Sequence, residues 1–88
     1  MLTYEDCVGL SDLLPDEIDA IAEHEHIPAM AAMEMGHYLL EQPDGTMVLK
    51  RMIVDDIELA RERGDTVHAA CLRIILRDFC KRCEIAAD

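Results

Sequence analysis

The side chains that could do chemistry in this chain are concentrated in its first half. Residues 1–49 contain eleven Asp or Glu and three of the four His, but no Lys or Arg. Within that half, Glu23 and His26 are three positions apart, and so are Glu34 and His37. Side chains at this spacing lie on one face of a helix and can ligate the same metal ion. The two pairs therefore predict a carboxylate–histidine metal site.

A chain this short needs a second copy to complete such a site. Di-iron centres of ferritin-like bundles take one Glu from each of two helices and a Glu-x-x-His pair from each of two others. A two-fold homodimer could supply that set, with Glu23 or Glu25 from one helix and Glu34 with His37 from another. This hypothesis predicts a dimer that binds iron. An acid-rich helical surface also produces Glu–His pairs without any metal, so the alternative of no metal stays open.

The four cysteines give a second, different metal hypothesis. Cys80 and Cys83 form a C-x-x-C, which Cys7 and Cys71 could complete as a structural zinc site. Structural zinc sites usually pair two such motifs, and this chain has one. The motif also falls at the end of a predicted helix, whereas a redox C-x-x-C needs a helix N-terminus. Cys71 is more simply interpreted as a small buried apolar residue.

Other chemistries have less support. The single serine, Ser11, precedes a helix, and no Gly-rich phosphate loop accompanies it, so nothing favours nucleophilic catalysis. Met30 and Met33 with His26 and His37 could form a soft Cu(I) site. A Met-rich helix is more often an adaptable core element or a binding surface.

The charge distribution excludes two classes of partner and favours a third. Residues 50–88 carry eight Lys or Arg against eight acids, so the net charge of −11 arises in the first half. An acidic half repels nucleic-acid phosphate and anionic membranes. It attracts a metal ion or a basic protein surface. We therefore expect a non-enzymatic binding or assembly module that acts through its acidic N-terminal half on a basic protein partner.

Length and composition predict a single all-α domain over residues 1–88. Apolar residues make up 51% of the chain and aromatic residues 3%, a composition typical of helices rather than sheets. The N-terminus lacks the basic and apolar regions of a signal peptide, and no apolar run is long enough to span a bilayer. We expect a cytoplasmic protein whose thiols are reduced.

Proline and acidic residues mark the first two of four main helices, which follow a short helical turn at residues 3–7. Pro15, with acids after it, begins a helix that runs to about Glu25. Pro28 cannot donate the next helical hydrogen bond, so the chain kinks or turns a corner there. A second helix then runs to about Glu41.

Caps and a glycine mark the third and fourth helices. Residues 43–45 predict a β-turn, and Thr46 is the expected cap of the third helix. Gly64 ends that helix in a left-handed conformation, and Asp65 caps the fourth, which gives a tight helical hairpin. Basic residues at every fourth position mark the solvent-facing side of the last helix: Arg73, Arg77 and Lys81.

Apolar residues at helical spacing predict the core and a partner surface. In the second helix, Ala29, Ala32 and Gly36 form a narrow ridge that lets another helix approach closely. Because this helix also combines Met with acids, it is our candidate for the dimer or partner surface. The predicted core consists of Ile18, Ile21, Met33, Leu40, Leu49, Met52, Ile53, Ile57, Cys71, Ile74, Ile75 and Phe79.

Overall fold

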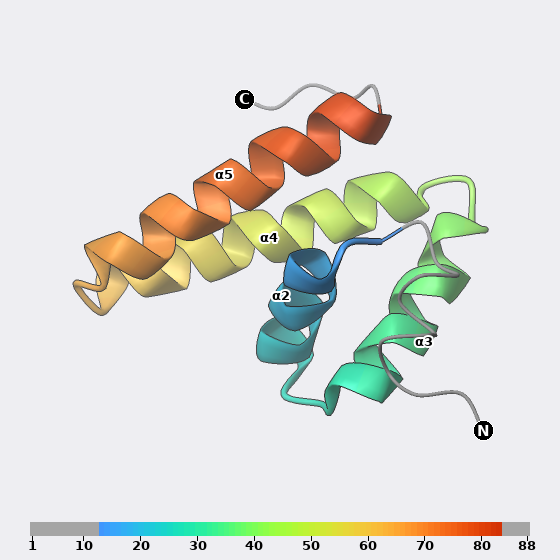
Figure 1. The fold of residues 1–88 in the computed structure, drawn as a ribbon, viewed down its shortest axis with the longest axis horizontal. Coiled ribbons are helices and arrows are strands. Elements are labelled where there is room, and N and C mark those ends of the chain that lie inside the picture. Colours follow the sequence, from blue (N-terminus) through green and yellow to red (C-terminus); the bar gives the residue numbers. More distant parts are fainter. Residues whose placement is uncertain (1–12, 84–88) are drawn as a thin grey trace.

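The computed structural model describes residues 13–83, and over this range the chain forms four α-helices and no strand (Figure 1). The helices are α2 (Pro15–Glu25), α3 (Ala29–Leu40), α4 (Gly45–Glu62) and α5 (Thr66–Cys83). The predicted all-α class and the four main helices are confirmed. The turn predicted at residues 3–7 lies outside the described residues. Within 13–83, no helix combines the length and the apolar character needed to cross a bilayer.

The four helices form two hairpins. α4 and α5 run antiparallel along the longest dimension of the molecule, while α2 packs near the middle of α4 and α3 lies toward its start (Figure 1). α2 lies between α3 and the long hairpin and contacts both α4 and α5. The position of α2 therefore determines where α3 is held.

α2 begins as its sequence predicts. Pro15 occupies the first turn, and the Glu17 carboxylate accepts a hydrogen bond from the backbone N–H of Leu14 at 3.0 Å. This is the arrangement of a capping box, in which an acid three residues into the helix satisfies an otherwise unpaired backbone donor.

A corner separates α2 from α3. His26 ends α2 in a left-handed conformation with φ of 56°. The N–H of Ile27 then donates to the carbonyl of Ala22 at 3.1 Å, which closes the last turn. Pro28 follows in an extended conformation and leads into α3. The chain thus turns at Pro28 and does not continue as one kinked helix.

The start of α4 differs from the prediction, because Thr46 is not its cap. The N–H of Gly45 donates to the carbonyl of Gln42 at 3.1 Å, and Asp44 takes the N-cap position without a side-chain hydrogen bond. A Cβ at residue 45 would overlap the backbone carbonyl of Leu39. Glycine therefore lets α3 and α4 meet more closely than a threonine-capped start would allow.

The turn between α4 and α5 follows the prediction. Gly64 adopts a left-handed φ of 76°, which glycine tolerates without a steric penalty. Asp65 Oδ1 then accepts a hydrogen bond from the N–H of His68 at 3.1 Å and caps α5. The two longest helices are thereby joined by a short turn over residues 63–65.

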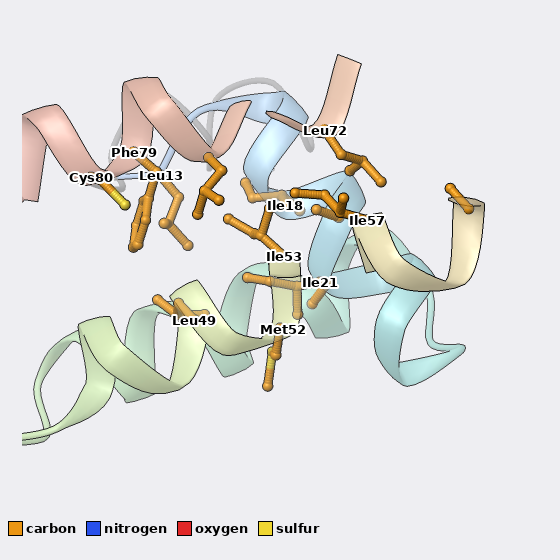
Figure 2. Packing of buried hydrophobic residues seen from close by; sticks show 14 of the residues in the cluster. Leu13, Ile18, Ile21, Leu49, Met52, Ile53, Ile57, Leu72, Phe79 and Cys80 are labelled. Atoms are coloured by element: carbon orange, nitrogen blue, oxygen red, sulfur yellow. The ribbon is translucent and has the colours of Figure 1, made fainter. Parts of the chain in front are cut away.

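The core lies where α2, α4 and α5 converge, and Leu13 and Ala32 complete it (Figure 2). Met33, Leu40 and Ile75 are partly buried and pack against it. Seven of the predicted core residues are buried: Ile18, Ile21, Leu49, Met52, Ile53, Ile57 and Phe79.

The core prediction is wrong for two residues of α5. Cys71 is exposed, and Ile74 and Val67 are 64% and 74% exposed. The helix is instead rotated so that Leu72, Leu76 and Phe79 enter the core. Its buried residues are Ala69, Leu72, Leu76, Phe79 and Cys80.

The small-residue ridge of α3 packs inside the fold. Ala32 and Gly36 are buried, and a Cβ at residue 36 would collide with the side chains of Leu13 and Ile21. α3 thus uses its narrow side to approach α2 closely. The opposite side of α3 faces outward.

Candidate functional site

The structure separates the four residues predicted to form a carboxylate–histidine metal site. Glu23 lies against α5, His26 is exposed at the end of α2, and Glu34 and His37 are exposed on α3. Within residues 13–83, no group of three or more His, Cys, Asp or Glu side chains could hold a metal ion. One chain does not assemble the site, and its completion across a dimer stays a prediction.

Glu23 instead joins a set of interacting carboxylates and imidazoles between α2, α4 and α5. One oxygen of Glu23 lies 2.7 Å from Nε2 of His68, at hydrogen-bond distance, and this contact ties α2 to α5. The other oxygen, Oε2, is buried and has no hydrogen-bond partner within the described range. We call this set the carboxylate–imidazole cluster, and it consists of Glu23, His24, Asp55, Asp56 and His68.

His24 connects α2 to α4 within this cluster. Its Nδ1 lies 2.6 Å from Oε2 of Glu25, and its Nε2 lies 3.1 Å from Oδ2 of Asp55. Burial acts to lower the pKa of His24, but the hydrogen bonds with Glu25 and Asp55 outweigh it and raise the pKa above 6.5. Because both ring nitrogens face carboxylates, neither is open to ligate a metal or to accept a proton from a substrate.

Asp56 is the most unusual member of the cluster, because it occupies a core position of α4 and is only 2% exposed. Its Oδ2 has no hydrogen-bond partner among residues 13–83. Burial, and after it the negative charge of Glu23, raise the pKa of Asp56 from 3.8 to about 6. The nearby His24 and His68 rings act in the opposite direction. A carboxyl with these properties carries its proton in mild acid.

The geometry of the cluster favours a structural role over a catalytic one. A group that transfers a proton to a substrate must come within hydrogen-bond reach of it. Because Asp56 is buried, a substrate cannot come within hydrogen-bond distance of its carboxyl group. Both nitrogens of the His24 ring already contact carboxylates. What the cluster can do is couple the packing of α2 on α4 and α5 to protonation.

Glu17, another buried acid, was not among the predicted site residues. It is 2% exposed, and its carboxylate pairs with Arg82 near the end of α5. Arg82 also contacts Asp78 at 3.3 Å. A basic residue from the second half of the chain thus neutralises an inward-facing acid of the first half.

The sequence did carry one signal for the cluster. Asp56 interrupts the regular apolar stripe of α4 between Met52, Ile53 and Ile57, so it stands where a core residue belongs. A charged residue at a core position is rarely fully buried unless it is paired or neutral. The identity of its neighbours, His24 and His68, depends on tertiary packing and has no local signature.

The predicted partner helix presents a continuous outward face. Glu34 has no ion-pair or hydrogen-bond partner within the described part of the chain, and His37 lies 3.3 Å from Glu41. Tyr38 is 61% exposed and Met30 41% exposed. These side chains recur at helical spacing and so lie on one side of α3. We call this surface the α3 outer face, and it consists of Met30, Glu34, His37, Tyr38 and Glu41.

The C-x-x-C motif lies in the last turn of α5, at the helix C-terminus where it was predicted. Cys80 is buried in the core, and Cys83 is partly buried against it. Cys71 is exposed, so the prediction that it is a buried small residue is wrong. Cys7 lies outside the described residues, and a zinc site that uses all four cysteines stays a prediction.

Comparisons of this chain with protein-family models, with curated proteins and with solved structures found no match.

We predict that Asp56→Asn stabilises the fold more at neutral pH than in mild acid. The folded-state pKa of about 6 exceeds the ordinary 3.8, so the stabilising effect of the bound proton is complete below pH 3.8 and lost as the pH rises through 6. Asparagine is uncharged throughout. Urea denaturation should show the variant's advantage growing by about 1–3 kcal/mol between about pH 4.5 and about pH 7.5. The exposed-site control Asp19→Asn should show no such growth, and an equal advantage at both pH values would contradict the assignment.

The dimeric metal hypothesis makes a separate prediction. A di-iron site shared by two chains requires about one iron per chain in protein purified without an affinity tag or chelator. Elemental analysis combined with native mass spectrometry measures metal content and subunit number together. A content below about 0.1 metal per chain would remove this hypothesis.

Proposed function

We propose that this protein is a non-enzymatic binding module that presents the α3 outer face to a basic partner surface. The observation that carries the proposal is the contrast between the two kinds of acid in the first half of the chain. Glu17, Glu23 and Glu25 face groups that carry or can carry positive charge, whereas Glu34 has no partner within residues 13–83. Glu34 therefore keeps its charge available for a partner. The exposed Asp16 and Asp19 of α2 do so as well, but they are not on the helix that carries the exposed Met30 and Tyr38.

The composition of the α3 outer face supports a protein partner over a simple cation. Exposed Tyr38 and Met30 lie beside the carboxylates of Glu34 and Glu41. Aromatic and Met side chains are enriched at protein interfaces, where they supply apolar contact area that a hydrated ion does not use. A partner that complements this face combines Lys or Arg with apolar side chains.

The fold also supports this use of α3. The buried side of the helix, at Ala32 and Gly36, is fixed against α2, and the turn at Gly45 fixes its C-terminal end against α4. A rigidly held helix loses little conformational entropy when a partner binds. The α3 outer face is thus a preorganised surface rather than a segment that must fold on binding.

A labelled helical peptide with Lys and Leu on opposite faces provides a direct probe of this surface. We predict that the double variant E34R/E41R raises the peptide dissociation constant at least about tenfold in a fluorescence anisotropy titration. The wild-type affinity should also fall as salt rises from about 0.05 to about 0.3 M, because screening weakens the charge contacts.

The matched control is D16R/D19R, which makes the same change in net charge on exposed positions of α2. It should change the dissociation constant by less than about threefold if the α3 outer face is the binding surface. Equal losses in the two variants would show that the peptide responds to net charge alone, and the proposal would fail.

A further inference from the structure

A hollow between α4 and α5 concentrates positive charge in an otherwise acidic protein. It has a volume of about 360 Å³, at the lower end of the range for binding pockets. One acid, Glu58, also contributes to its wall. We call this hollow the basic groove, and its apolar and basic lining consists of Val54, Ile57, Leu76, Arg61, Arg73 and Arg77.

The three arginines of the basic groove have no acidic partner among residues 13–83. Within the described residues, Arg61, Arg73 and Arg77 form no salt bridge or side-chain hydrogen bond, although acids outnumber bases in the sequence. A guanidinium group binds carboxylates through two parallel hydrogen bonds. The groove therefore offers three such donors above an apolar floor.

The basic surface continues along α4 toward its N-terminus. A second hollow of about 260 Å³ shares Val54 with the first and is also lined by Met47, Lys50 and Arg51. From Met47 to Arg61, α4 rises by about 21 Å. The two hollows together make an elongated strip in which basic and apolar side chains alternate.

We infer that the basic groove receives the α3 outer face of a second copy of this chain. The inference rests on the proposed function and names the basic partner. The α3 outer face extends from Met30 to Glu41, a rise of about 16.5 Å, and so fits along the strip. Its carboxylates match the arginines in charge, and its Met and Tyr side chains match the apolar floor.

The two surfaces do not meet within one chain. α3 joins the N-terminal end of α4 through the turn at Gly45, whereas Arg61 lies near the opposite end of α4, next to the α4–α5 turn (Figure 1). Each chain thus carries two complementary surfaces in different places. Two copies that exchange these contacts reciprocally form a closed two-fold dimer, whereas contacts made in one direction only are heterologous and extend from copy to copy.

Net charge sets the conditions under which the contact forms. Each copy carries −11, so two copies repel one another at long range. At about 0.15 M salt the Debye length is about 8 Å, which screens distant charges more than close, desolvated pairs. Self-association is therefore measured at physiological ionic strength.

Exchanging the charges of the two surfaces tests the inference. E34R/E41R places arginines on the α3 outer face, and R73E/R77E places acids in the basic groove. Either variant alone meets like charges at the contact and should self-associate at least about tenfold more weakly than wild type in sedimentation velocity. An equal mixture restores opposite charges at both contacts and should associate to within about threefold of wild type.

The matched control for the groove is R63E/K81E, which makes the same net charge change at exposed positions outside the lining. It should associate to within about threefold of wild type. A control as weak as R73E/R77E, or a mixture that fails to recover, would overturn the inference. So would a wild-type chain that stays monomeric up to about 1 mM. That last result would leave the peptide titration, and with it the proposed function, standing independently.

Discussion

Burial of α2 against the α4–α5 hairpin is the interaction on which the rest of the structure depends. Ile18 and Ile21 enter the core between the two long helices, and full burial of each contributes about 1.5–3 kcal/mol. Glu17 is drawn in with them, and its pairing with Arg82 offsets the cost of removing a carboxylate from water. Because α3 is reached through the corner at Pro28, this docking also fixes where the outward acids stand.

The same docking divides the acidic half of the chain into two groups. The inward-facing acids of α2, Glu17 and Glu23, contact Arg82 and His68, so partners within the molecule interact with their negative charge. The acids of α3 turn outward, because its small residues occupy the inward side. Asp56 of α4, from the second half of the chain, joins these inward acids, and its proton links helix packing to pH. An uneven distribution of formal charge in the sequence thereby becomes one outward acidic face and one inward titrating cluster.

Much of the fold could be predicted from local signals in the sequence. The members of the carboxylate–imidazole cluster and of the basic groove could not. Pro28 and Gly64 act through their own backbone chemistry, so the interruption between the first two helices and the hairpin between the last two follow from the sequence, which left a kink and a corner both open at Pro28. The rotation of α5 does not, because that helix is apolar around most of its circumference and its neighbours decide that Phe79 rather than Ile74 is buried. The neighbours of Asp56 and the convergence of three arginines likewise depend on contacts between distant segments. The exposed acids of α3 were predicted because they need no partner.

The most direct test of this account measures which carboxylates water-borne reagents can reach. Dilute, monomeric protein would be treated with carbodiimide and an amine, and mass spectrometry of its peptides would give a modification rate for each acid. The account predicts that Glu34 and Glu41 react at least about tenfold faster than Glu17 and Asp56, because the first pair is exposed on α3 and the second is buried. Similar rates for all four carboxylates would contradict the division of these acids into inward and outward groups.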